Sequence, residues 1–183
     1  MMNALSNPVA MPAPDKDRLL ALLRDTRDRF LASLAGVDDE PSRRRPAEGR
    51  WSVLDCVEHI AGAEMFMLRL AKGPRRPRPA GSPNREEFFL LRMVDRNVKA
   101  EAPERGRPRG RFANLDEARK QFEIARGETI GFVEGSQEDL RATEITHPIF
   151  GDVSAYELLI IIAKHVERHA LQIDEIRAAL ALQ

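Results

Sequence analysis

The sequence predicts an all-α protein in which four long helices form a bundle and one additional helix lies in an insert. Apolar residues recur at helical spacing in four long stretches of the chain. Two of these stretches begin with a serine and an acid at the spacing of a capping box. The composition, 43% hydrophobic and 32% charged with one Trp and one Tyr, is typical of a soluble helical protein. Four such helices bury their apolar faces against one another as a bundle.

The chain of 183 residues is expected to form one domain, residues 15–183, behind a flexible leader of residues 1–14. The leader has prolines and lacks a basic start followed by a long apolar stretch, which argues against a signal peptide. No run approaches the roughly 18 apolar residues of a membrane helix. The single cysteine, Cys56, excludes an intramolecular disulfide and suits a reducing compartment. We therefore expect a cytoplasmic protein without membrane contact.

Lysine plus arginine equal aspartate plus glutamate at 29 each, so no global field favours nucleic acid. Positive charge gathers in residues 73–111, where ten arginines and one lysine stand against five acids. This basic insert is expected to hold the additional helix, from Ser82 and Pro83 to about Ala100, because serine caps a helix and proline suits its first turn. Its arginines lack interleaved aromatic residues apart from Phe112 and are interpreted as a solvated, flexible face. Nucleic acid is therefore not an expected partner.

The first and third bundle helices are predicted over residues 15–36 and from Asn114 or Asp116 to near Gly135. In both stretches apolar residues alternate with charged residues at helical spacing. Prolines and a glycine between the first and second helices predict a connecting loop.

The second bundle helix is predicted over residues 53–72. Ser52 and Asp55 have the form of a capping box, which marks where the helix begins. Trp51 precedes the cap and is expected to pack on Cys56 as a hydrophobic staple.

The fourth bundle helix is predicted from Tyr156 to Leu182, about 28 residues and roughly 42 Å long. Ser154 and Glu157 form its capping box, and no proline or glycine interrupts it. The preceding residues 140–152 contain the motif THPIFGD, which predicts a structured loop or a short extended turn.

Three of the four histidines are candidate metal ligands. His165 and His169 lie four residues apart, so a helix places both imidazoles on one face. They share that face with apolar residues, and His59 lies on the apolar side of the second helix. Buried imidazoles need partners and repel each other when charged, so a metal that binds neutral imidazoles satisfies both requirements. Three nitrogen ligands with an open position are typical of a catalytic metal site.

Other readings of these residues stay open. A pair of histidines at this spacing, or a lone histidine such as His59, can equally be a core residue with satisfied hydrogen bonds. His147 lies in the loop-like THPIFGD motif and is interpreted as a cap or as a residue at the mouth of a pocket. Cys56 is three residues before His59 and could approach the site, although a cysteine in an apolar stripe is more often a small core residue.

The segments WSVLDCVEHIAGAE and HPIFGDVSAYELLIIIAKHVERHALQIDEI resemble the DinB-like superfamily of metal-dependent four-helix-bundle proteins. The resemblance covers most of the chain and is weakest in the basic insert. It implies an up-down-down-up bundle and a ligand triad of His59, His165 and His169 for nickel, zinc or a similar divalent ion. It also implies a homodimer.

The resemblance leaves the reaction open, because a fold does not determine chemistry. The superfamily includes transferases and isomerases that use a low-molecular-weight thiol. We therefore expect a metal-dependent enzyme in which the ion activates water or a thiol against a small-molecule substrate, as a transferase, an isomerase or a hydrolase. The alternative is a non-catalytic metal-binding module for stress response or interaction. No general base is assigned, because helix phase places Glu58 and Glu167 beside the histidine stripe.

Overall fold

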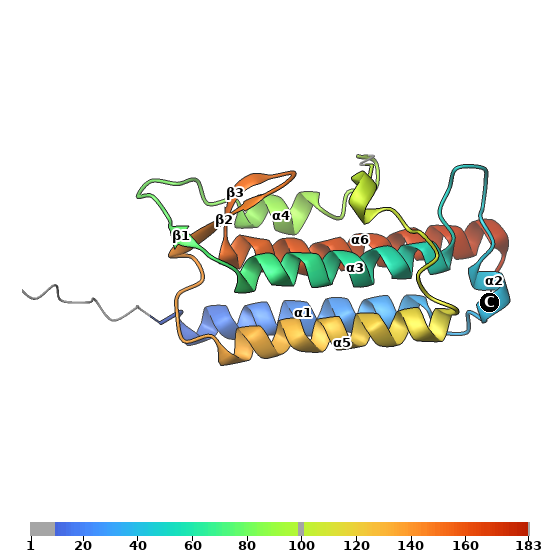
Figure 1. Cartoon of the computed structure of the whole chain (residues 1–183), viewed down its shortest axis with the longest axis horizontal. Helices are drawn as coiled ribbons and strands as arrows, with labels where there is room; N and C mark the ends of the chain where they lie inside the picture. The colour runs from blue at the N-terminus through green and yellow to red at the C-terminus, as the bar shows by residue number, and fades with distance from the viewer. Residues whose placement is uncertain (1–9, 99–100, 183) are drawn as a thin grey trace, which may run out of the picture.

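The computed structural model describes residues 10–98 and 101–182, and four long helices dominate it (Figure 1). The four are α1 (Ala13–Ser33), α3 (Val53–Lys72), α5 (Leu115–Gly135) and α6 (Ala155–Leu180). Helices α1 and α6 run in one direction along the bundle, and α3 and α5 run in the other (Figure 1). The predicted all-α, up-down-down-up bundle is therefore confirmed.

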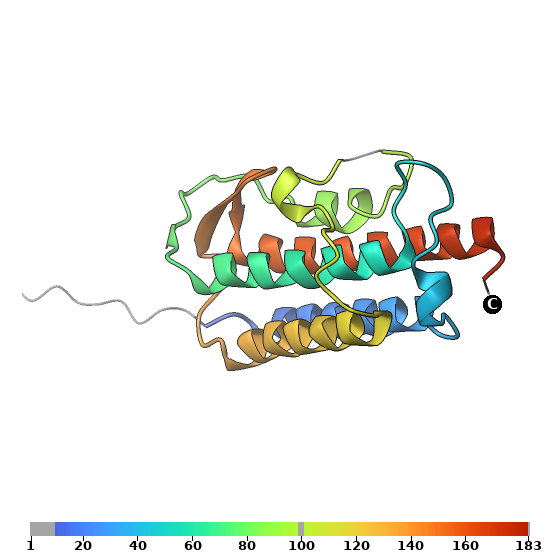
Figure 2. The same cartoon turned by 45° about the vertical axis from the view of Figure 1, so that its right-hand side comes forward.

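The direction of the helices explains why the chain needs an insert. Helix α1 packs on α6 and α3 packs on α5, so both of these neighbouring pairs are parallel. The antiparallel contacts of α3 with α6 and of α1 with α5 complete the bundle. A chain that leaves α3 at one end and enters α5 at the other must travel back about 30 Å, the length of a 20-residue helix. The insert makes this return past α6 and α3 (Figures 1 and 2).

The capping residues begin the helices where the sequence predicts. Ser52 Oγ accepts from the Asp55 N–H at 3.1 Å, and the Asp55 carboxylate accepts from the Ser52 N–H at 2.9 Å. Ser154 and Glu157 make the same reciprocal pair at 3.0 and 2.7 Å. Asn114 caps α5 with its side chain. These local hydrogen bonds satisfy N–H groups that the helices cannot satisfy themselves.

Helix α1 begins at Ala13, two residues before the predicted start. Pro12 occupies the N-cap and Pro14 lies in the first turn, where a missing N–H costs nothing. Met11, from the expected leader, is buried in the core. Residues 1–9 of that leader lie outside the described residues. A short helix, α2 (Asp39–Ser42), lies in the predicted loop before α3.

The helix predicted from Ser82 to Ala100 is much shorter in the structure, which has α4 (Glu86–Arg92) and a separate 3₁₀ turn, η1 (Glu104–Gly106). Pro83 precedes α4 rather than opening it. Ala100 itself lies outside the described residues.

Tertiary contacts set both ends of α4. The Glu157 carboxylate accepts from the Arg85 N–H at 2.6 Å just before the helix. After the helix, Arg168 donates to the carbonyls of Met93 at 3.2 Å and Asp95 at 2.6 Å. These carbonyl oxygens bind the Arg168 guanidinium instead of the backbone N–H groups that a longer helix would direct at them. Local sequence therefore could not predict this helix end.

A small antiparallel sheet lies at one end of the bundle, and the sequence did not predict it. Its order is β1 (Arg76–Pro77), β2 (Thr143–His147) and β3 (Gly151–Ser154). The predicted loop or extended turn is thus a hairpin, in which Ile145 pairs with Val153 and both are buried. Gly151 has a φ of 67° after the turn, a conformation that favours glycine.

The arginines at the start of the insert form ion pairs rather than the flexible face expected from the sequence, and only Arg76 among them is largely exposed, at 49%. They pair with acids of the bundle and the hairpin: Arg75 with Glu138, Arg76 with Glu144 and Asp152, and Arg78 with Glu157. Arg75 and Arg78 are 16% and 15% exposed. The positive charge of the insert therefore serves partly to attach it to the rest of the protein.

One ion pair lies inside the bundle. The Arg126 guanidinium of α5 donates to both oxygens of Glu64 on α3, at 2.6 and 3.0 Å. It also donates to the Leu23 carbonyl at 2.7 Å and to Thr26 Oγ1 at 2.9 Å, both on α1. Arg126 is fully buried and Glu64 nearly so. This network joins three helices through buried polar groups that satisfy one another.

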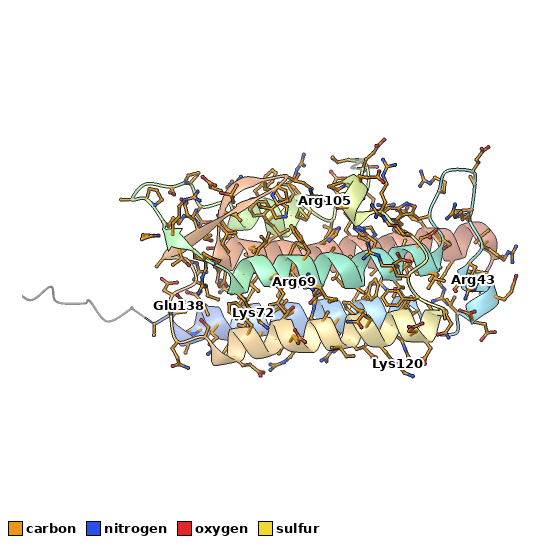
Figure 3. The ribbon with its side chains drawn as sticks, viewed as in Figure 1. Arg43, Arg69, Lys72, Arg105, Lys120 and Glu138 are labelled. Carbon is orange, nitrogen blue, oxygen red and sulfur yellow. The ribbon has the colours of Figure 1, made fainter. Side chains whose placement is uncertain are left out.

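Many other charged side chains lie on the outside, as Lys120 on α5 and Arg43 beside α2 show (Figure 3). Within the described residues, no helix combines the length and the apolar character that crossing a membrane requires.

We predict that Arg126→Ala lowers the free energy of unfolding by about 3–5 kcal/mol, because it leaves the Glu64 carboxylate buried without its partner. Urea denaturation measures this loss. The control is Arg119→Ala, which removes an exposed pair with Asp116 on the same helix and should cost below about 1 kcal/mol. Equal losses in the two variants would contradict the assigned role of the buried network.

Candidate metal centre

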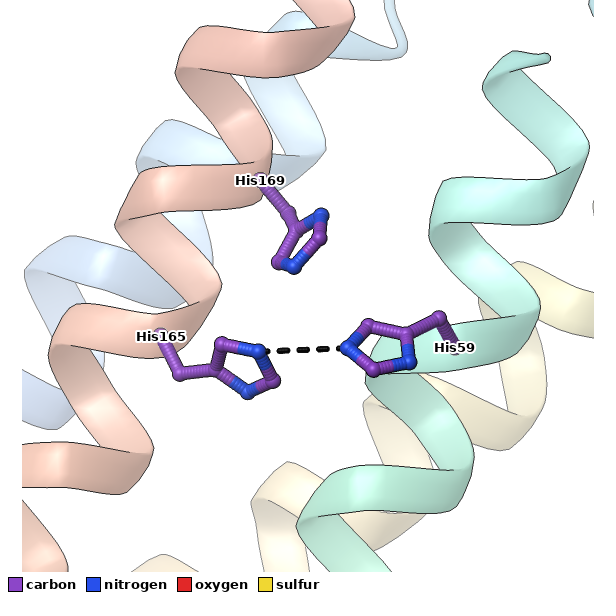
Figure 4. Close-up of side chains that lie close together, drawn as sticks. All are labelled: His59, His165 and His169. Atoms are coloured by element: carbon purple, nitrogen blue, oxygen red, sulfur yellow. Dashed lines mark hydrogen bonds between the residues drawn. The ribbon is translucent and has the colours of Figure 1, made fainter. Parts of the chain in front are cut away.

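Three histidines from two helices meet inside the bundle (Figure 4). His59 comes from α3, and His165 and His169 lie one turn apart on α6. One ring nitrogen of each lies within 4.8 Å of those of the other two. His59 Nε2 and His165 Nε2 lie 3.2 Å apart, within hydrogen-bond distance (Figure 4). The structure therefore brings together the three residues that helix phase and resemblance predicted as a triad.

The hydrogen bond of His59 determines which of its nitrogens faces the other histidines. Its Nδ1 lies 2.6 Å from the carbonyl oxygen of Gly106. Because a carbonyl can only accept, Nδ1 carries the hydrogen and Nε2 carries a lone pair. This lone pair points towards His165, which is the arrangement that a histidine ligand with a second hydrogen-bond partner adopts.

The surroundings favour the neutral form of the three imidazoles. His59 and His169 are each 7% exposed, and His165 is partly exposed. Burial lowers the pKa of His59. It lowers the pKa of His165 and His169 well below the ordinary value, and repulsion between the histidines lowers these two pKa values further. Neutral imidazole is the form that binds a metal ion.

The donor set fits a divalent metal ion. An ion with ligand nitrogens at about 2.0–2.1 Å in tetrahedral geometry separates two of them by roughly 3.3 Å, close to the spacing of His59 and His165. His169 Nδ1 is buried and has no hydrogen-bond partner among the described residues. Imidazole ligands suit zinc and nickel among the divalent ions.

Trp51 forms one wall of the site. Its ring centroid is 4.9 Å from that of His59 and 5.9 Å from that of His169, with which it stacks at 16°. It also packs against the buried cluster that contains Cys56. Trp51 further lines an open pocket of about 280 Å³, together with Pro46, Ala47, Arg50, Gln172, Glu175, Ile176 and Ala179. The triad and the pocket therefore share this indole.

Cys56 and His147 lie outside the triad. Cys56 is fully buried, and burial raises the pKa of its thiol far above the ordinary range, so it is an inert core residue. His147 Nδ1 accepts from the N–H groups of Ile149 and Phe150 at 3.1 and 3.2 Å. Its ring stacks on Phe150, and it holds the turn of the hairpin.

The acids nearest the triad in sequence are engaged elsewhere. Glu58 accepts from two backbone N–H groups of the insert, Glu64 binds Arg126, and Glu167 pairs with Lys164 at 2.6 Å. None of them belongs to the cluster of candidate ligands.

The sequence did not reveal Gly106 as a partner of the site. Gly106 contributes a backbone carbonyl, and it lies 47 residues from His59 along the chain. A backbone carbonyl has no sequence signature, so only the course of the insert shows this contact.

Known proteins resemble this chain in sequence. The family model of the DinB superfamily matches residues 22–173. The Bacillus subtilis (strain 168) protein YuaE is 23% identical over 158 residues, which are 86% of this chain and 96% of YuaE. A Geobacillus thermodenitrificans (strain NG80-2) protein with the name "Putative metal-dependent hydrolase" is 32% identical over 95 residues, or 51% of this chain and 53% of that protein.

Two solved structures share the fold. YfiT from Bacillus subtilis, described as a probable metal-dependent hydrolase with an unusual four-helix bundle topology, matches with a TM-score of 0.60 at 13% identity, over 97% of this chain and 94% of YfiT. TT2238, described as a four-helix bundle protein, matches with a TM-score of 0.58 at 20% identity, over 87% of this chain and 98% of TT2238. Because the family match spans most of the sequence and the bundle agrees with both structures, this chain belongs to the DinB superfamily.

Proposed function

We propose that this protein is a metal-dependent enzyme of the hydrolase class, with His59, His165 and His169 as the ligands of one divalent ion. The observation that carries the proposal is the convergence of three imidazoles from α3 and α6, with one ring nitrogen of each within 4.8 Å of the others. The names of YfiT and of the Geobacillus protein, which describe metal-dependent hydrolases, support the reaction class.

A divalent ion in such a site supplies Lewis-acid chemistry, because it lowers the pKa of a nucleophile such as water or a thiol. The residues of the chain supply the geometry. Gly106 orients His59, and Trp51 packs beside the rings of His59 and His169. The pocket beyond Trp51 combines apolar walls with Arg50 and Gln172, which suits a small polar substrate. Nickel or zinc as the ion, a thiol as cosubstrate and a homodimer stay predictions.

We predict that the purified protein binds about one zinc or nickel ion per chain through the three imidazoles. His165→Ala and His169→Ala should each lose most of this metal, because the remaining two ligands leave the ion exchangeable. Elemental analysis after gel filtration measures the content. The control is His147→Ala, which removes the one histidine outside the triad and should retain the metal. Unchanged metal content in the His165 and His169 variants would contradict the proposal.

The alternative function, a non-catalytic metal-binding module, has one observation in its favour. The triad joins α3 to α6, so an ion there would also stabilise the bundle. We predict that a chelator abolishes turnover in a panel of ester, amide and thiol-transfer substrates, and that added zinc or nickel restores it. A chelator that lowers the melting temperature while no member of the panel is turned over would instead support the module.

We predict that the metal-free protein loses stability as the pH falls from about 7.5 to 5.5. The pKa of His165 and His169 lies well below 6.5 in the folded state and near 6.5 in the unfolded state, so the unfolded state binds more protons in this range. The stability present above pH 6.5 is therefore lost on acidification, by up to about 1.4 kcal/mol per pH unit for each histidine.

Urea denaturation in the presence of a chelator measures this effect. The reference is a variant with both His165→Gln and His169→Gln, which keeps every carboxylate of the protein but lacks the two titrating rings. Its stability should fall less steeply with pH than that of the wild type. Parallel pH profiles would show that these imidazoles are not held neutral by the fold.

A further inference from the structure

The insert between α3 and α5 contacts the triad directly, and the residues that hold it there lie next to the histidines in sequence. The insert packs on α6 through α4 and on α3 through η1. Beyond η1, the chain continues across α3 to the start of α5 (Figure 2). The bundle topology requires this return, but the return does not by itself place a carbonyl on a histidine.

Glu58, the residue before His59 on α3, holds the end of the insert. It is 3% exposed, and its two oxygens accept from the N–H groups of Arg109 at 2.6 Å and Arg111 at 3.0 Å. The Arg111 guanidinium lies 3.7 Å from the same carboxylate. A buried carboxylate that accepts two backbone N–H groups is a strong and directional anchor. It determines where the backbone runs immediately after Gly106.

Arg168, the residue before His169 on α6, anchors an earlier part of the insert. Its guanidinium donates to the carbonyls of Met93 at 3.2 Å, Asp95 at 2.6 Å and Val98 at 2.5 Å. Arg96 in the same stretch makes two hydrogen bonds to Glu175 of α6, at 3.0 and 2.8 Å. Each ligand-bearing helix therefore holds the insert by a charged residue adjacent to a histidine of the triad.

We propose that Glu58 is a positioning residue of the metal centre: by binding the backbone of Arg109 and Arg111, it holds the Gly106 carbonyl on His59 Nδ1. That hydrogen bond keeps His59 in the tautomer and the ring orientation in which Nε2 faces the other two histidines. The proposal deepens the metal-binding function and rests on it. The basic insert therefore connects α3 to α5 and also contributes the carbonyl group that holds His59 in place.

The experiment measures the zinc dissociation constant by competition with a chromophoric chelator in wild type, Glu58→Gln, Glu58→Asp and Glu144→Gln. Loss of a hydrogen-bond partner behind a metal ligand weakens metal binding by about 10- to 100-fold, which is the result expected for Glu58→Gln. Glu58→Asp keeps the charge but is one methylene too short to hold both N–H groups, so it should also weaken binding. Thermal unfolding of each variant checks that the bundle forms.

Glu144→Gln is the matched control, because Glu144 is also a buried acid that anchors the insert. It binds Arg76 at 2.8 Å from the sheet, away from the triad. Zinc affinity in this variant should equal that of the wild type. Hydrogen exchange at the Arg109 and Arg111 amides should be faster in Glu58→Gln and unchanged in Glu144→Gln, a readout that does not depend on metal.

The outcomes separate this inference from the proposed function. Zinc binding by the wild type with unchanged affinity in Glu58→Gln would overturn the positioning role alone. Wild-type affinity in Glu58→Asp would show that only the charge of Glu58 matters, and it would also overturn the positioning role. Equal weakening of zinc binding in Glu144→Gln would overturn that role as well. Failure of the wild type to bind zinc or nickel would overturn the proposed function and this inference together.

Discussion

The antiparallel packing of α3 against α6 is the constraint on which the candidate site depends. His59 points from one helix and the His165–His169 pair from the other, so the spacing of their nitrogens depends on the axial register of the two helices. Capping boxes fix where each helix begins, and the buried Arg126–Glu64 pair ties α3 to α5 and α1. A shift of either helix by one turn, about 5.4 Å, would separate the triad. The core therefore positions the site as well as stabilising the fold.

An imidazole that binds a metal through one nitrogen usually has a hydrogen-bond partner on the other. For His59, the topology of the bundle explains where this partner comes from. An up-down-down-up order requires one long connection between the parallel neighbours α3 and α5. The chain uses that connection to deliver the Gly106 carbonyl to His59. Charged residues beside the ligands, Glu58 and Arg168, attach the connection to both helices. The same residues 73–111 that appear in the sequence as a basic insert thus contribute to the site.

Local sequence signals predicted the bundle and the triad because these depend on short-range rules. Helical periodicity and capping residues gave the bounds of α3 and the starts of α5 and α6, and helix phase placed the histidines inward. The extent of α4, the strand at Arg76 and the pairing of the insert's arginines depend on acids and carbonyls far away in sequence. The role of Gly106 was invisible for the same reason. Prediction failed where a tertiary contact, rather than the local chain, determined the backbone.

The metal centre is tested most directly by X-ray absorption spectroscopy of the zinc- or nickel-loaded protein. We expect three imidazole nitrogens at about 2.0–2.1 Å, with the multiple scattering that identifies histidine rings and with no sulfur ligand. A shell with fewer than three imidazoles, or with a sulfur ligand from Cys56, would contradict a metal centre built from His59, His165 and His169.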